Sequence, residues 1–252
     1  MTKLLRISGA ALALSSTVAA HGFVQYITSA STQYLGWDPG FRYQDPLPSI
    51  PGWSADNPDI GFVEPQSFGH PDIICHKSAV PGQEYVQVEA GSTIRLHWFT
   101  WPESHVGPIF DYLAPCSANG CASDDKTSLR FVKIAQAGLK PNVTWETNWL
   151  EAWVVDDFIK NDFLWDVEIP AEIESGTYVL RHEIIALHSA WDVNGAQAYP
   201  QCINLNVTNG GTRKMTEGTS PTTFYDPAEP GMHINVYSGL TEYPFPGPEL
   251  WN

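Results

Sequence analysis

Positive charge is scarce in this chain. Lysine and arginine together number 13 against 28 acidic residues, which gives a formal net charge of -15 over 252 residues. A nucleic-acid binder needs a basic surface to displace counterions from phosphate, and a protein attracted to anionic lipid needs one as well. We therefore expect neither a nucleic acid nor a membrane as a partner.

Charged residues of either sign are few, and cysteine is rarer still. Only 16% of the residues are charged, against about 25% in typical globular proteins. Four cysteines are too few for a small, disulfide-dense scaffold. A hydrophobic fraction of 43% and an aromatic fraction of 12% suffice for a buried core, so we do not expect a disordered chain.

Long apolar runs are also missing, and the first twenty residues have the pattern of a targeting signal. After residue 20 no segment approaches the ~18 apolar residues of a membrane span. Residues 1–20 have a positive start, a short apolar stretch and the cleavage sequence Val18-Ala19-Ala20, which is the pattern of a secretory signal peptide. The alternative is a buried helix, for which the stretch holds too many hydroxyl residues. We predict a secreted, extracellular protein.

Secretion has three consequences. The cysteines of an extracellular protein are normally paired. The sequons that begin at Asn142 and Asn206 become candidate glycosylation sites. Cleavage after Ala20 also makes His21 the first residue, so that one residue carries a free α-amine and an imidazole and is able to chelate one metal ion.

The remaining chain shows no internal repeat and no serine/threonine-rich linker. We therefore expect residues 21–252 to form a single domain without an appended binding module. Apolar residues alternate with polar ones at 94–99, 163–169, 202–207 and 232–237, and this period of two predicts strands. Gly/Pro/Asn turns separate the runs, which favours an antiparallel β-sandwich. Residues 31–82 are the longest aperiodic region, and residues 148–160 are a candidate helical segment.

The four cysteines allow three pairings. Cys116 and Cys121 are five positions apart, which suits a local loop, and this choice leaves Cys75 to pair with Cys202. The alternative, half of a zinc site at Cys116 and Cys121, lacks a second cysteine pair at matching spacing.

Histidine is the residue type most able to carry chemistry here. Most histidines in a protein are structural, and these do not form a His-Glu-x-x-His motif. On one strand His182 and His188 would share a face, and His105 lies in a Pro/Gly-bounded loop after a predicted strand. The eight are His21, His70, His76, His97, His105, His182, His188 and His233.

Seven stretches, in order along the chain, resemble fungal lytic polysaccharide monooxygenases of auxiliary activity family 9, formerly glycoside hydrolase family 61. They are His21-Gly22, Asp72–Cys75, Ser104–Pro108, Asp125-Lys126 with Phe131–Ile134, Tyr178–His188, Gly195–Cys202 and Pro246–Trp251. The ordered set, with histidine at the cleavage site, carries the resemblance; no single motif does.

The resemblance implies an all-β, immunoglobulin/fibronectin-like sandwich with long loops, short helical segments and a flat surface that holds one type 2 copper ion. His21 would bind copper through its α-amine and a ring nitrogen, His105 would supply a third nitrogen, and Tyr199 would lie axially. His188 and Gln197 would lie near the oxygen-binding position. The family's two disulfides match the pairing favoured above.

Ligand chemistry agrees with this assignment. Three nitrogens and a weak oxygen suit copper(II), which heads the affinity order for such ligands. Gln197 and Tyr199 are two positions apart and would face the same way on a strand. The implied activity is copper-dependent oxidative cleavage of β-1,4-glucan, cellulose or hemicellulose, at C1 or C4. It would use oxygen or hydrogen peroxide with an external electron donor, and the protein would be a monomer.

A crystalline polysaccharide needs flat, exposed aromatic residues. The candidates are Tyr34, Trp37, Trp53 and, best placed, Tyr243, because the family often has a surface tyrosine just before its Pro-Gly-Pro ending. Two other functions remain open. A hydrolytic endoglucanase would need two facing carboxyl groups, which the neighbouring pairs Asp124-Asp125 and Asp156-Asp157 do not obviously supply. A non-catalytic copper- or carbohydrate-binding relative is the second alternative.

Overall fold

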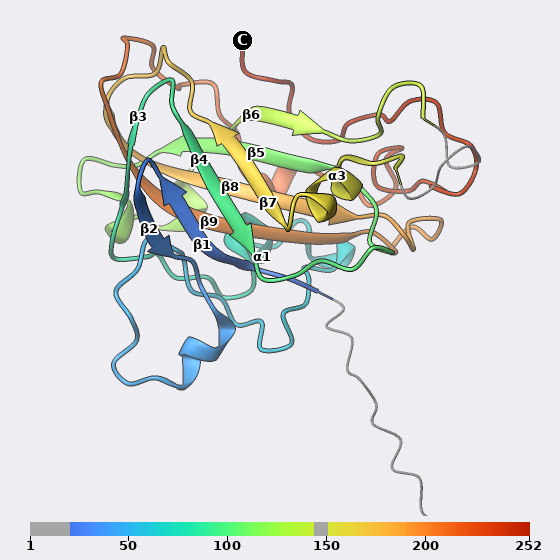
Figure 1. Ribbon diagram of the computed structural model, residues 1–252, viewed down its shortest axis with the longest axis horizontal. Coiled ribbons are helices and arrows are strands. Elements are labelled where there is room, and N and C mark those ends of the chain that lie inside the picture. Colours follow the sequence, from blue (N-terminus) through green and yellow to red (C-terminus); the bar gives the residue numbers. More distant parts are fainter. Residues whose placement is uncertain (1–20, 144–150) are drawn as a thin grey trace, which may run out of the picture.

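Two β-sheets packed face to face form the body of the protein in a computed structural model (Figure 1). The structure describes residues 21–143 and 151–252, so the predicted signal peptide lies outside the described residues. The smaller sheet has the order β2-β1-β4-β7, and all its pairs are antiparallel. Its strands are β1 (Val24–Ser29), β2 (Thr32–Leu35), β4 (Thr93–Trp98) and β7 (Leu164–Glu168).

The larger sheet has the order β3-β9-β8-β5-β6. All its pairs are antiparallel except β3 with β9, which is parallel. The strands are β3 (Val86–Glu89), β5 (Ile109–Pro115), β6 (Val132–Ala137), β8 (Gly176–Ala186) and β9 (Gln197–Thr208). The predicted all-β sandwich is confirmed.

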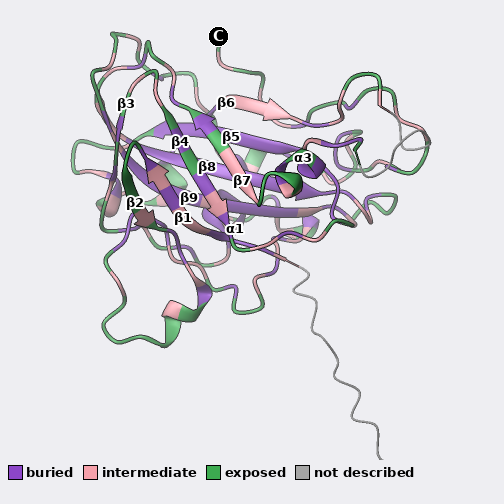
Figure 2. Ribbon diagram, in the orientation of Figure 1, coloured by how far each residue is buried: buried purple, intermediate pink, exposed green. Residues whose placement is uncertain are grey.

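The core follows from the alternation along the strands. In β4, Ile94, Leu96 and Trp98 are buried between the sheets while Arg95 points outward. The central strand β8 is different, because it is buried on both faces from Tyr178 onward. In Figure 2 the buried residues follow the sheets, and the exposed ones gather in the loops.

Helical structure is short and lies in the connections. In the described part of the chain the α-helices are α1 (Asp72–Cys75) and α3 (Val154–Lys160). The 3-10 turns are Pro39–Tyr43, Pro65–Ser67, Cys121–Ser123, Lys126–Ser128 and Pro221–Thr223. The helix α3 confirms most of the predicted segment 148–160, of which residues 148–150 lie outside the described part.

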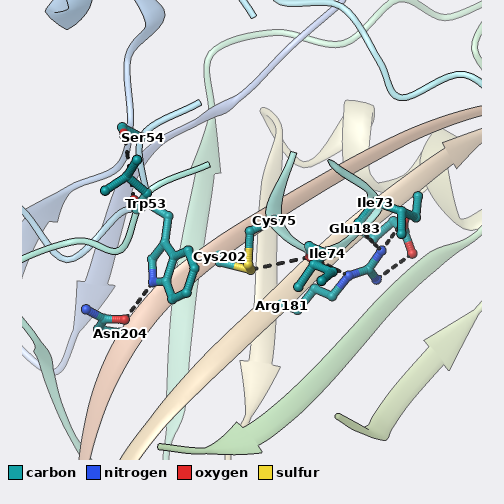
Figure 3. Close-up of a disulfide and its surroundings, with 10 residues drawn as sticks. Trp53, Ser54, Ile73, Ile74, Cys75, Arg181, Glu183, Cys202 and Asn204 are labelled. Carbon is teal, nitrogen blue, oxygen red and sulfur yellow. Dashed lines mark hydrogen bonds and ion pairs between the residues drawn. A yellow bond between two sulfur atoms is a disulfide. The ribbon is translucent and has the colours of Figure 1, made fainter. Parts of the chain in front are cut away.

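Both predicted disulfides are present. Cys75 pairs with Cys202 and joins α1 to β9, while Cys116 pairs with Cys121 within one loop. Figure 3 shows the longer bridge packed between two buried polar contacts, a Trp53–Asn204 hydrogen bond and the Arg181–Glu183 ion pair. This bridge ties the aperiodic region 31–82 to the core.

Two details of the strand prediction were wrong. The strand β2 lies inside the region predicted to be aperiodic; its residues are mostly exposed, so no alternation marks it. Residues 232–237 do not form a strand. Met232 and Val236 are buried there, so the alternation is real, but it comes from a segment that packs on the core without joining a sheet.

His76, directly after α1, gives a prediction about stability and pH. Its ring is buried, Nε2 donates to the carbonyl of Gly61 at 2.9 Å, and Nδ1 accepts from the amide of Lys77 at 2.8 Å. The neutral ring therefore satisfies both partners. Burial, opposed by the hydrogen bond to Gly61 and helped by the charge of Lys77, lowers the pKa of His76 from 6.5 to about 4.

Between pH 4 and pH 6.5, His76 is therefore protonated in the unfolded chain but neutral in the folded protein. The stability that His76 contributes is complete above pH 6.5 and is lost as the pH falls toward 4, by about 3 kcal/mol in all. We expect His76→Asn to flatten the pH dependence of the unfolding free energy of metal-free protein, measured in denaturant. His70→Asn, at an exposed histidine, is the control, and an unchanged slope for His76→Asn would contradict this account.

Candidate metal centre

His21 is positioned by main-chain contacts around it. The amide of Val24 donates to Oε1 of Gln201 on β9 at 2.6 Å, and the amide of Phe99 donates to the carbonyl of Phe23 at 2.9 Å. These bonds tie the segment that follows His21 to both sheets. The residue that the predicted cleavage would expose is thereby held in a fixed place.

Gly22 leaves no room for a side chain. A Cβ atom there would lie 2.0 Å from the carbonyl oxygen of Thr100. We expect Gly22→Ala to displace His21 and to cost about 1–3 kcal/mol of stability. Copper affinity, measured by calorimetric titration, should fall with it. Gly69→Ala is the control because nothing lies within 4 Å of that position; equal copper affinity in both variants would contradict the prediction.

His105 lies in the loop between β4 and β5. The indole Nε1 of Trp101 donates to the His105 carbonyl at 2.9 Å, and the hydroxyl of Ser104 lies 3.1 Å from Nδ1 of the His105 ring. A partner on Nδ1 fixes the ring and leaves Nε2 for a ligand. The His105 and His21 ring centroids are 5.7 Å apart, so two histidines 84 positions apart in sequence face one another.

Tyr199 completes this group from the start of β9. Its ring centroid lies 5.8 Å from that of His21 and 4.8 Å from that of Trp101. Its hydroxyl donates to Oε1 of Gln197 at 2.8 Å. The expectation that Gln197 and Tyr199 share a face of one strand is confirmed.

His188 lies beside His105. The two rings are stacked, with centroids 3.9 Å apart. Nδ1 of His188 is buried and has no hydrogen-bond partner among the described residues. The strand β8 ends at Ala186, so His188 follows the strand. The prediction that it shares a strand face with His182 was wrong.

The electrostatics keep these groups neutral. Burial, with help from His188 and His21, lowers the pKa of His105 to about 3. Burial also lowers the pKa of His21, although the charge of Asp59 opposes this shift. The pKa of His188 is lowered by burial as well. Burial, followed by the charge of Asp59, raises the pKa of Tyr199 far above its ordinary value. Neutral imidazole is the form that binds metals.

The donor set fits copper better than a closed structural site. Within residues 21–143 and 151–252, no three His, Cys, Asp or Glu side chains form a group suited to a metal ion. A site built from two histidine rings and an α-amine would not form such a group. Imidazole and amine nitrogens with a weak phenol oxygen suit copper(II), and the unpartnered Nδ1 of His188 leaves hydrogen-bonding capacity beside them.

His182 lies elsewhere. Its Nδ1 bonds Asp111 at 2.7 Å, and its Nε2 accepts from the indole of Trp98 at 3.1 Å. The ring is fully buried, so His182 is a core residue between the two sheets.

The prediction of Tyr243 as a surface residue was wrong. The side chain is only 8% exposed, its hydroxyl donates to the carbonyl of Gly231 at 2.7 Å, and the rings of Trp153 and Phe245 pack on it. Trp37 and Trp53 are buried as well. Of the four predicted aromatic residues, only Tyr34 is partly exposed, and its hydroxyl is bonded to the amide of Gln87.

The acidic pairs considered for hydrolysis make structural contacts. Asp156 accepts from the amide of Trp153 at the start of α3, and Asp157 pairs with Lys140. Asp124 accepts from the amide of Ser117, and Asp125 accepts from that of Thr127. These local contacts give no sign of facing acid and base groups.

The sequence analysis missed three residues around this centre. Trp101 packs on both Tyr199 and His105, Phe62 contacts His21, and Asp59 supplies the nearby negative charge. Trp101 was the one that could have been found, because it lies four positions before His105. Phe62 and Asp59 come from the aperiodic region, whose course no pattern predicts.

Comparison with known proteins shows which family the chain belongs to. Residues 21–243 match Auxiliary Activity family 9 (formerly GH61). AA9 family lytic polysaccharide monooxygenase F of Malbranchea cinnamomea is 49% identical, over 96% of this chain and 95% of that protein. AA9 family lytic polysaccharide monooxygenase F of Emericella nidulans is 47% identical, over 100% of this chain and 99% of that protein.

Solved structures agree. Cel61B of Hypocrea jecorina, described as a glycoside hydrolase family 61 member, has a TM-score of 0.85 and 39% identity, covering 92% of this chain and 100% of that one. The extended catalytic domain of LPMO9A of H. jecorina has a TM-score of 0.83 and 42% identity, covering 91% and 90%. The chain therefore belongs to Auxiliary Activity family 9 and is an enzyme of the lytic polysaccharide monooxygenase class.

Proposed function

We propose that the mature protein, starting at His21, binds one copper ion and cleaves a β-1,4-glucan oxidatively. The observation that carries this proposal is the meeting of His21, His105 and Tyr199 at one place, with His188 stacked beside them. The α-amine and ring of His21 and the ring of His105 would hold the metal, and Tyr199 would face it.

The copper ion would supply electron transfer to oxygen or hydrogen peroxide, which leads to hydroxylation at C1 or C4 of the sugar. The protein's own residues would orient and protect this chemistry. Ser104 fixes the His105 ring, and Gln197 accepts from the Tyr199 hydroxyl and so sets its direction. His188 and Gln197 would hydrogen-bond the oxygen co-substrate.

Cellulose is the proposed substrate class, with hemicellulose as the second choice. One similar solved protein, 26% identical with a TM-score of 0.77 over 92% of this chain and 99% of that one, is described as a cellulose-active polysaccharide monooxygenase from M. thermophila. The low charge content suits a neutral polymer. We further propose a secreted monomer served by an external electron donor. No helix in the described residues is long and apolar enough to span a bilayer.

The test is product analysis with and without a reductant. Copper-loaded protein is incubated with phosphoric-acid-swollen cellulose, xyloglucan or glucomannan, and the soluble products are separated by chromatography. We expect aldonic acids or C4-oxidised ends only when reductant is present. Unoxidised fragments without reductant would show hydrolysis, and silence on all three substrates would favour the binding-only alternative.

Glycosylation is proposed at both sequons. Asn142 lies exposed in a turn, where a glycan would extend into solvent. Asn206 lies on β9, and its amide donates to Oε1 of Gln87 on the neighbouring strand. A glycan there would replace one of the two Nδ2 hydrogens and leave only the other to donate this bond.

A further inference from the structure

Two loop segments meet at His188 and, apart from His188 itself, they contain none of the predicted site residues. The first is residues 188–191, which follow β8, and the second is residues 233–237, near the C-terminus. Both lie at the end of the sandwich drawn on the right of Figure 1. The amide of Ile234 donates to the carbonyl of Ala190 at 2.8 Å, so the segments are in direct contact.

Side chains add two more bonds between them. The hydroxyl of Tyr237 donates to the carbonyl of His188 at 3.0 Å, and Nε2 of His233 bonds the carbonyl of Trp191 at 2.9 Å. The backbone on which the His188 ring is mounted is therefore held by Tyr237. That ring is otherwise placed by its stacking on His105, because its Nδ1 has no partner among the described residues.

The same segments present aromatic rings to solvent. Trp191 is 49% exposed and Tyr237 is 38% exposed, and their ring centroids are 5.7 Å apart. Asp192 and Asn194 are exposed next to Trp191. An exposed indole flanked by carboxylate and amide groups suits a pyranose, whose faces carry C–H groups and whose rim carries hydroxyls.

We propose that Trp191 contacts a sugar ring of the bound β-1,4-glucan and that the Tyr237 hydroxyl transmits this contact to His188. This inference rests on the proposed function. A sugar bound on Trp191 would shift the 188–191 segment. Because the Tyr237 hydroxyl bonds the His188 carbonyl, the position of the His188 ring would change with that shift. Trp191 is then a substrate-contacting residue, and Tyr237 is a positioning residue for His188.

Three variants separate the two roles. Trp191→Ala removes the ring, Trp191→Phe keeps a smaller one, and Tyr237→Phe keeps its ring but loses the hydroxyl. We expect Trp191→Ala to weaken binding to swollen cellulose about threefold to tenfold, with partial recovery in Trp191→Phe and no change in the copper EPR spectrum without substrate. Tyr237→Phe should bind cellulose as the wild type does, while its turnover number falls about tenfold.

A copper-free measurement tests the link itself. Metal-free protein with isotope-labelled histidine is titrated with cellohexaose, and the His188 ring resonances are followed by NMR. We expect them to shift in the wild type and to stay in place in Tyr237→Phe. The same shift in Tyr237→Phe, no shift in a wild type that does bind, or full cellulose binding by Trp191→Ala would each overturn the inference. A wild type that neither binds nor oxidises any glucan would instead reject the proposed function, and the inference with it.

Discussion

Replacement of His105 by alanine is expected to abolish oxidative activity and to weaken copper binding by more than about 100-fold. The estimate is a lower limit, because losing a group that merely supports a ligand already costs about 10- to 100-fold. The His105 ring lies against that of His21, with centroids 5.7 Å apart. The other rings that the described residues place against His21 are those of Phe62 and Tyr199, not a histidine. Isothermal titration with copper(II) measures the affinity.

The matched control is His70→Ala. The His70 ring is exposed and bonds Asp72, two positions along the chain, so its removal should leave copper affinity and product formation unchanged. If His105→Ala bound copper as tightly as His70→Ala does, His105 would not be a ligand and the proposed site would be wrong.

The largest effect on stability is expected at Glu183. Its carboxylate pairs with the guanidinium of Arg181 through two bonds of 2.6 and 2.7 Å and accepts from the hydroxyl of Tyr225. Both members of the pair are 0% exposed. Glu183→Gln keeps the shape but leaves a buried positive charge without its counterion, which costs about 3–5 kcal/mol.

Arg181 also makes Glu183 important beyond the pair. The guanidinium donates to the carbonyls of Ile73 and Ile74 at 2.8 Å, and so anchors α1 next to the Cys75–Cys202 disulfide (Figure 3). Denaturant unfolding measures the loss. Asp166→Asn is the control, because it breaks the equally bidentate but exposed pair with Arg95 and should change little. Equal losses in the two variants would contradict the argument from burial.

Alternation of apolar and polar residues identified three of the strands. In β4 and β7 one face lies on the core and the other is largely open to solvent. In β9 the residues alternate in chemistry, although the strand is buried on both faces along most of its length. The strand β2 was not predicted, because an exposed edge strand needs no apolar face. Residues 232–237 were misread because alternate burial also arises where a loop covers the core.

The site depended on the family resemblance more than on local pattern. No spacing rule joins His21, His105 and Tyr199, since they are brought together by the packing of two sheets. The position of Tyr243 in the sequence led to a wrong prediction of its exposure. Its place before the Pro-Gly-Pro ending suggested a surface residue, but burial of its ring against Trp153 removes it from any substrate surface. The exposed pair Trp191 and Tyr237 was invisible in sequence because its partners are far apart in the chain.

The most direct test of the central claim is the copper(II) EPR spectrum of the mature protein, recorded with His21 as the first residue and again with one alanine added before it. We predict nitrogen couplings from three ligands in the first protein. In the second, where a peptide bond replaces the α-amine, that spectrum should be lost. An extended protein with an unchanged spectrum and unchanged copper affinity would contradict the claim that the first residue of the mature chain holds the metal.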